Sequence, residues 1–190
     1  TIVAKANQPI VAYTGDDGKF QFIYKYVSNK PYLADDSAAS YRHNCELLDD
    51  GILYCARLND AGQGEWLALL HGQGFLTEKH GFHSQADVLI ECRRAAEMIG
   101  ATPMDRPEDI ETNAVNDCTY VMLTKNHKRQ KTSPGNQRTG NTTGHILEFV
   151  HPLINKKQND LRDHTSRHFQ WHTFILGGHP SQGDRGERGF

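Results

Sequence analysis

Short apolar segments that alternate with polar residues recur along the chain, and this pattern predicts β-strands. In residues 20–27, aromatic side chains occupy every second position from Phe20 to Tyr26, which is the period of a strand. Residues 10–13 form a shorter apolar run, and the Gly/Asp-rich residues 14–19 lie between the two runs. A β-rich pair of runs around such a cluster predicts a hairpin.

A second hairpin is predicted by residues 51–58 and 65–70. Both runs are rich in β-branched, aromatic or aliphatic side chains, and a Gly/Asn/Asp stretch connects them. Cys55 lies inside the first run and Trp66 at the start of the second. We expect both side chains to pack in a core rather than to carry chemistry.

Three further strand-like runs follow in the second half, at residues 118–124, 144–150 and 169–176. Short strands with long irregular connections are typical of a sandwich or a propeller, and the repeated hairpin–loop–strand order favours the propeller. The sequence therefore predicts a mainly β fold. Residues 155–167 are expected to form a polar connection, and residues 29–44 a long loop.

One helix is predicted, over residues 84–99. Ser84 can cap its start, apolar positions then recur at helical spacing, and Gly100 provides a stop. Cys92 falls on the apolar stripe, so we expect it in the core. The helix leads directly into residues 101–110.

Residues 101–110 read Ala-Thr-Pro-Met-Asp-Arg-Pro-Glu-Asp-Ile, with Arg106 among carboxylates. Each proline restricts its own backbone, and Pro107 disfavours a helical conformation at Arg106. We therefore expect an extended, stiff segment. Two interpretations are open: a rigid turn in which Arg106 neutralises Asp105, Glu108 or Asp109, or a functional site.

Composition excludes several classes of protein. A length of 190 residues allows one domain with a real core, and hydrophobic residues make up 37%, as expected for a loop-rich chain. The net charge of −2 and the scattered basic residues argue against nucleic-acid binding. The one basic cluster, residues 125–131, is interpreted as a solvated loop. No apolar run approaches the roughly 20 residues that a membrane-spanning helix needs, so no stable membrane insertion is expected.

Cysteine and histidine spacing gives no strong metal motif. The four cysteines lack C-x-x-C spacing, which argues against a zinc ribbon or a redox pair. His164, His168 and His172 would share one face of a helix, but the run from Phe169 is β-like, and a metal role is disfavoured.

Several stretches, in fixed order along nearly the whole chain, resemble the PhoX family of secreted bacterial alkaline phosphatases. They are Val-Ala-Tyr-Thr-Gly-Asp-Asp (11–17), Phe-Ile-Tyr-Lys-Tyr-Val-Ser (22–28), Gly-Ile-Leu-Tyr-Cys-Ala-Arg (51–57), Gly-Glu-Trp-Leu (64–67), Arg-Ala-Ala (94–96), Gly-Ala-Thr-Pro-Met-Asp-Arg-Pro-Glu (100–108), Val-Met-Leu-Thr (121–124), Asn-Thr-Thr-Gly-His-Ile-Leu-Glu (141–148) and His-Thr-Phe-Ile-Leu (172–176). The Asp-Arg-Pro-Glu core in its longer context is the most specific of them.

The resemblance implies a six-bladed β-propeller that holds calcium and iron and hydrolyses phosphomonoesters. It also implies export through the twin-arginine route, hence a periplasmic or secreted protein whose partner is a small phosphomonoester. Carried over by residue, Arg106 would contact the substrate phosphate and serve catalysis, and Glu108 would ligate metal. Arginine can grip two phosphate oxygens, and a metal-bound carboxylate helps to neutralise charge on the phosphoryl group.

Four further residues complete the predicted site. Asp16 and Asp17 are supporting calcium ligands, because hard cations take carboxylate oxygens from tight loops. Asn126 and Arg138 are substrate-binding polar groups near its mouth. The chain departs from the family pattern at Gly18, where an acidic residue is common, and at Lys125, where the family commonly has asparagine.

The chain is too short for six blades of roughly 40–45 residues each. It begins without a Met or a signal sequence and ends in a Gly/Arg-rich stretch, residues 183–190. We therefore expect a single domain, residues 1–190, that is the middle portion of a propeller truncated at both ends. Two other hypotheses stay open: a non-catalytic binding or scaffold segment, and a calcium-dependent propeller hydrolase acting on esters or lactones.

Overall fold

The structure is a computed structural model that describes residues 1–154 and 161–178. The strands are β1 (Ile2–Val3), β2 (Pro9–Gly15), β3 (Lys19–Gln21), β4 (Ile23–Pro31), β5 (Gly51–Leu58), β6 (Gln63–Ala68), β7 (Met104–Asp105), β8 (Pro107–Thr112), β9 (Thr119–Leu123), β10 (His145–Val150) and β11 (His168–Leu176). The helices are α1 (Ala38–Cys45), the 3-10 helix η1 (Glu78–His80), α2 (Gln85–Ile90) and α3 (Cys92–Met98). Residues 155–160, within the predicted polar connection, and the predicted ending at 183–190 lie outside the described residues.

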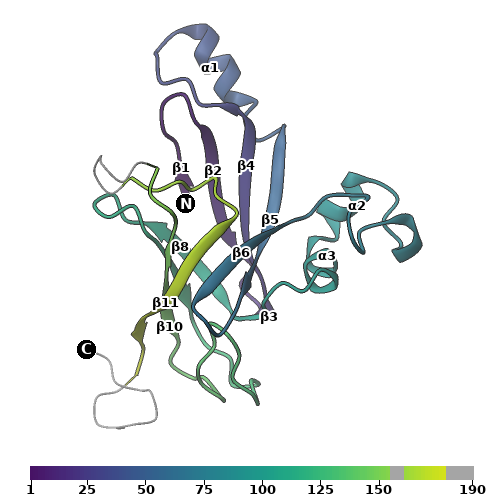
Figure 1. The fold of residues 1–190 in the computed structure, drawn as a ribbon, viewed down its shortest axis with the longest axis vertical. Helices are drawn as coiled ribbons and strands as arrows, with labels where there is room; N and C mark the ends of the chain where they lie inside the picture. The colour runs from purple at the N-terminus through teal and green to yellow at the C-terminus, as the bar shows by residue number, and fades with distance from the viewer. Residues whose placement is uncertain (155–160, 179–190) are drawn as a thin grey trace.

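Nine of the described strands form one antiparallel sheet in the order β1-β2-β4-β5-β6-β11-β10-β9-β8. The sheet curls until it is nearly closed, with β2 near β8, and β3 pairs with β7 in a separate two-stranded sheet (Figure 1). The predicted mainly β, partial propeller-like fold is confirmed. Both predicted hairpins are present, with β2 paired to β4 and β5 paired to β6. The predicted strand over residues 20–27 is nevertheless divided, because its first residues belong to β3, which pairs with β7, and β4 begins at Ile23.

The first core fills the inside of the curled sheet. It gathers buried side chains from both halves of the chain, among them Tyr13, Trp66, Leu147 and Phe149. Trp66 is fully buried, and its ring centroid lies 5.0 Å from that of Phe169 and 6.2 Å from that of Phe149. Aromatic pairs at such distances stabilise beyond the area they bury. The expected burial of Trp66 is therefore confirmed.

The second core lies between the outer face of the sheet and the helices. Phe22, just before β4, Tyr24 of β4 and Cys55 of β5 pack there with side chains of α2 and α3, and Cys92 packs against the cluster. The period of two in β4 thus serves two cores, because Ile23 points to the first core while its aromatic neighbours point to the second. Cys55 is fully buried, as predicted.

The predicted helix over residues 84–99 is broken. Ser84 does cap its start, accepting from Asp87 N at 3.2 Å, but α2 and α3 are separate helices on either side of Glu91. Arg94 of α3 is anchored outside the helix, because its guanidinium lies 3.8 Å from the Phe82 ring centroid and donates to His80 O. Tertiary contacts of this kind can outweigh local helix propensity.

Two interpretations of loops are wrong. Residues 29–44 include the end of β4 and all but the last residue of α1, whose N-cap Ser37 accepts from Ser40 N at 3.1 Å. The basic residues 125–131 are not a fully solvated loop, because Arg129 is buried against Asp105. All four cysteines are free thiols. Within the described residues, no helix is long and apolar enough to cross a membrane.

Candidate functional site

Two stretches that are far apart in the sequence meet where β2 ends. A Cβ atom added to Gly15 would lie 2.1 Å from the carbonyl oxygen of Pro107, so the two main chains are in direct contact. Next to this contact, Lys19 of β3 pairs with Asp105 of β7. Only glycine permits such a close approach. The structure therefore brings the predicted acidic turn and the predicted stiff segment together.

Arg106 forms an ion pair with Asp17. Its Nη2 lies 2.8 Å from Asp17 Oδ2, and this carboxylate raises the pKa of the guanidinium. Of the carboxylates in the segment itself, Asp105, Glu108 and Asp109, none is the ion-pair partner of Arg106; the partner, Asp17, lies 89 residues earlier in the chain, and Glu108 adds a longer-range attraction. The Arg106 side chain is 26% exposed and that of Asp17 is 42% exposed, so an anion could reach the guanidinium from solvent.

Asp16, next to Asp17, is held by a second arginine. Both carboxylate oxygens of Asp16 accept from Arg93 on α3, with Nη2 at 2.7 Å from Oδ1 and Nε bonded to Oδ2. Such a paired contact fixes the plane of the carboxylate. The ion pair thus fastens the acidic turn to α3, and the same helix leads into the 101–110 segment.

The backbone of Arg106 is not extended as predicted. Its φ of 57° lies in the left-handed region, which non-glycine residues occupy only when the surroundings enforce it. The prediction correctly excluded a right-handed helix before Pro107 but missed this alternative. Thr124 N donates to Arg106 O at 3.2 Å, and the Pro107 carbonyl rests on Gly15. The neighbouring main chain therefore holds the strained residue in place.

Asn126 and Arg138, the two predicted polar groups, both act within the protein. Asn126 is fully buried, its N–H donates to Asn141 O at 2.7 Å, and its Nδ2 has no hydrogen-bond partner. Arg138 Nη1 donates to Gly177 O at 2.9 Å and its Nη2 donates to Gly144 O. Arg138 therefore braces the adjoining ends of β10 and β11.

The carboxylates of Asp16, Asp17 and Glu108 are the kind of donor that calcium prefers. Glu108 is exposed. Across residues 1–154 and 161–178, however, no group of three or more His, Cys, Asp or Glu side chains could hold a metal ion. Asp16 and Asp17 are engaged by arginines. A cation here therefore requires ligands beyond the described residues and the release of these ion pairs.

A buried polar network, which the sequence patterns did not reveal, lies at another part of the sheet. The hydroxyl of Tyr13 lies 3.2 Å from His151 Nε2 and 2.9 Å from His164 Nδ1, and His164 Nε2 lies 3.2 Å from Asp117 Oδ1. Burial lowers the pKa of both histidines. His172, by contrast, is exposed and pairs with Glu148, so the three evenly spaced histidines share no site.

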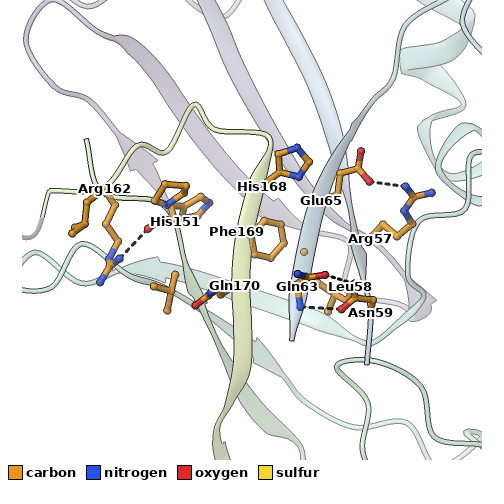
Figure 2. Close-up of a pocket in the computed structure, with 14 residues that line it drawn as sticks. Arg57, Leu58, Asn59, Gln63, Glu65, His151, Arg162, His168, Phe169 and Gln170 are labelled. Carbon is orange, nitrogen blue, oxygen red and sulfur yellow. Dashed lines mark hydrogen bonds and ion pairs between the residues drawn. The ribbon is translucent and has the colours of Figure 1, made fainter. Parts of the chain in front are cut away.

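A pocket of about 710 Å³ lies beside this network (Figure 2). It is lined by Arg57, Leu58, Asn59, Gln63, Gly64, Glu65, Val150, His151, Pro152, Leu153, Arg162, His168, Phe169 and Gln170. Its charged groups already have partners, since Arg57 pairs with Glu65 at 2.5 Å and Arg162 Nη1 donates to His151 O at 2.9 Å. None of the predicted site residues lines it. We therefore retain the Asp17–Arg106 region as the candidate site, because it combines a part-exposed guanidinium with carboxylates, although the pocket is the deeper feature.

Comparison with known proteins gives two matches. The family model described as alkaline phosphatase PhoX matches residues 1–189. The chain is also similar to the solved structure of Pseudomonas fluorescens PhoX in complex with vanadate, a transition state analogue, with 35% identity and a TM-score of 0.84. The match covers 98% of this chain and 32% of that one, so this chain spans about a third of its length. No curated protein matches the chain.

Proposed function

Since this chain belongs to the PhoX alkaline phosphatase family, we propose that it forms part of an enzyme that hydrolyses phosphate monoesters with the help of bound metal. The observation that carries the proposal is the meeting of Arg106 with the acidic turn at Asp17. A permanently charged, part-exposed guanidinium beside carboxylates is a suitable place for a metal-assisted phosphate site.

Arg106 binds the substrate phosphate in this proposal. Its planar fork can donate to two phosphate oxygens, which both orients the ester and stabilises the charge that develops as the phosphoryl group is transferred. Asp17 holds the side chain by one nitrogen, so the other N–H groups can face the anion. The vanadate bound by the Pseudomonas fluorescens protein supports a phosphate-like ligand for the family.

Glu108, Asp16 and Asp17 would supply carboxylate oxygens to calcium and iron, together with ligands from beyond the described residues and after release of the ion pairs to Arg93 and Arg106. Bound metal would help to neutralise phosphoryl charge and to activate the attacking oxygen. Asn126 and Arg138 are proposed, from the family resemblance, as substrate-binding polar groups near the mouth of the site. This role requires their rearrangement, because Asn126 is fully buried and Arg138 donates to the carbonyl oxygens of Gly144 and Gly177. In this proposal the described chain is one domain, the middle portion of a larger propeller, and the protein is exported to the periplasm or secreted.

The test measures release of phosphate from a chromogenic monoester by the full-length protein. We expect activity that a calcium chelator abolishes and added calcium restores, and a loss of about 100-fold or more in kcat/KM for Arg106→Ala. Arg42→Ala, on the exposed surface of α1, is the matched control and should behave as wild type. Activity that survives both the chelator and Arg106→Ala refutes the assignment.

A second candidate is a non-catalytic binding or scaffold segment. It is favoured by the finding that no three metal-ligating side chains gather among residues 1–154 and 161–178. Elemental analysis of the purified full-length protein distinguishes the two, because a scaffold carries no stoichiometric calcium and iron. A panel of ester and lactone substrates, assayed alongside, tests the related hydrolase activity.

A further inference from the structure

A buried ion pair lies directly beside Arg106. Asp105 is 0% exposed and Arg129 is 6% exposed, and the guanidinium Nε lies 2.6 Å from Asp105 Oδ1. Burying two charges is costly unless hydrogen bonds satisfy the remaining donors and acceptors of both groups. Because such a pair is costly to bury, the groups that it holds in place indicate why the fold retains it.

Arg129 grips the main chain as well as the carboxylate. Its Nη2 donates to Pro103 O at 2.8 Å, and its Nη1 donates to Ser133 Oγ at 3.1 Å. One side chain from the 125–143 loop therefore fixes two points of the segment, one on each side of Met104. Both points lie just before Arg106 in the chain.

Two asparagines from the same loop complete the clamp. Asn141 Nδ2 donates to Asp105 Oδ2 at 3.1 Å, and Asn136 Nδ2 donates to Pro103 O at 3.2 Å. Both side chains are buried, at 2% and 0% exposure. Both oxygens of the Asp105 carboxylate are thus occupied, and the residue cannot rotate without breaking a charge-assisted bond.

The clamp meets the strained backbone at Arg106. A positive φ strains the backbone of a non-glycine residue, and it persists only where the surroundings over-determine it. Thr124 N and the Gly15–Pro107 contact hold the C-terminal side of Arg106. Asp105 and Arg129 hold the N-terminal side, where β7 pairs with β3 and not with the large sheet.

We propose that Arg129 is a positioning residue that acts through Arg106. By fixing Asp105 and Pro103, it sets the direction in which the Arg106 guanidinium leaves the backbone and so its alignment with a phosphate. The inference rests on the proposed function only where it concerns phosphate. Its structural part, that Arg129 maintains the left-handed conformation of Arg106, stands separately.

Lysine cannot replace Arg129 in this role. Its ammonium is a point donor without a planar fork, so it cannot hold the Asp105 carboxylate and the Pro103 carbonyl in one plane. Arg129→Lys still neutralises the buried Asp105 carboxylate, but it removes the planar arrangement of donors that also binds the Pro103 carbonyl. This makes it a sharper probe than removal of the charge.

The activity test is a double-mutant cycle in the full-length protein. Arg129→Lys is introduced into wild type and into Arg106→Lys, and kcat, KM and inhibition by inorganic phosphate are measured for each. We expect a loss of about tenfold or more in kcat/KM, with weaker phosphate inhibition, when Arg106 is present. In the Arg106→Lys background we expect less than about twofold, because the residue through which Arg129 acts is gone. Equal losses in both backgrounds overturn the proposal.

The second readout needs no activity. The Cα and Cβ chemical shifts of Arg106 report its backbone conformation in the folded protein. We expect the left-handed signature in wild type and in the control Arg42→Lys, and its loss or broadening in Arg129→Lys. A left-handed Arg106 unaffected by Arg129→Lys overturns the inference even if the protein hydrolyses no phosphoester. If wild type hydrolyses no phosphoester but Arg129→Lys still changes the Arg106 chemical shifts, only the proposed function is refuted.

If Arg129→Lys does not fold, Asp105→Asn provides the same measurements. It keeps the shape of the side chain and weakens the bond to Arg129 without removing the Arg129–Pro103 contact. We expect the same direction of change in the Arg106 shifts. Unchanged shifts in folded Asp105→Asn count against the proposal.

Discussion

Lys25 is a buried lysine inside the curled sheet, and its replacement by methionine should change how stability depends on pH. Its side chain is 0% exposed, and its Nζ donates to His164 O at 3.1 Å and to Ser166 O at 2.7 Å. The ammonium also lies 4.9 Å from the centroid of the Trp66 ring. Burial nevertheless lowers the pKa of Lys25 from 10.5 to about 7.

The sign follows from counting protons. Between pH 7 and pH 10.5 the unfolded chain keeps the Lys25 proton while the folded protein has released it. Stability rises with pH wherever the unfolded state binds more protons. The slope approaches 1.4 kcal/mol per pH unit, and between pH 7 and pH 8.5 it integrates to about 1.6 kcal/mol of added stability from this one group.

The assay is urea unfolding at pH 7, 7.5, 8 and 8.5, followed by tryptophan fluorescence. Wild type should gain about 1.6 kcal/mol in the free energy of unfolding across this range, and Lys25→Met should lack this gain. Lys30→Met is the matched control, because Lys30 lies on the same strand with a 48% exposed side chain. It should retain the wild-type slope.

Only the slope is predicted, because methionine also leaves two carbonyl oxygens without their donor, at a cost of about 1–3 kcal/mol each. Lys25 also helps to lower the pKa values of His151 and His164, which lie below 6.5 in the fold, and the comparison therefore starts at pH 7. A wild-type slope that persists in Lys25→Met would refute the reasoning. It would mean that Lys25 stays protonated in the fold, held by its two carbonyl acceptors and the Trp66 ring.

Three further predictions concern packing and thiol chemistry. Gly15→Ala places a Cβ against the Pro107 carbonyl, so we expect a loss of about 1–3 kcal/mol in urea unfolding; an unchanged midpoint contradicts the close approach. Trp66→Ala removes the fully buried centre of the first core and should cost about 3–5 kcal/mol by the same assay. Exposed Cys45 should react with a thiol reagent in the folded protein, while Cys55, whose pKa is raised by burial to about 12, should react only on unfolding; early labelling of Cys55 would show that its strand opens.

Local pattern accounts for the strands but not for how they are covered. Alternation in β4 marks a strand correctly, yet it cannot tell which face meets water, and here both faces are buried. From the alternation alone, Lys25 would be placed on the solvent-facing side of the strand. That face becomes buried only because the sheet closes around it. The curled arrangement is a long-range property that no short window contains.

For the helices, local periodicity is an unreliable signal of where a helix forms and where it ends. Helix α1 has little amphipathic signal, because its only buried residue is Ser40, and it depends on caps and on contacts such as Asn44 Nδ2 to Leu33 O at 2.7 Å. Periodicity therefore fails to detect it. Residues 84–99 have the periodic signal and still break at Glu91, where Arg94 is held by the preceding loop. Capping at Ser84 was predictable because it depends on residues three apart.

The candidate site likewise has some features that local sequence predicts and others that only the tertiary structure reveals. Asp-Arg-Pro-Glu is a local motif, so Arg106 and Glu108 could be singled out from the sequence, but their partners could not. Asp17 lies 89 residues earlier in the chain, and Arg129 belongs to a basic run that looks solvated.

A charged run is normally exposed because burial of an unpaired charge is too costly. Arg129 escapes this rule because a carboxylate 24 residues away, two asparagine amides and a proline carbonyl converge on one buried place. Such convergence follows from tertiary structure alone. Arg129 therefore departs from the local rule. This departure is a physical reason to look for function beside the groups it binds, Asp105 and Pro103, which precede Arg106.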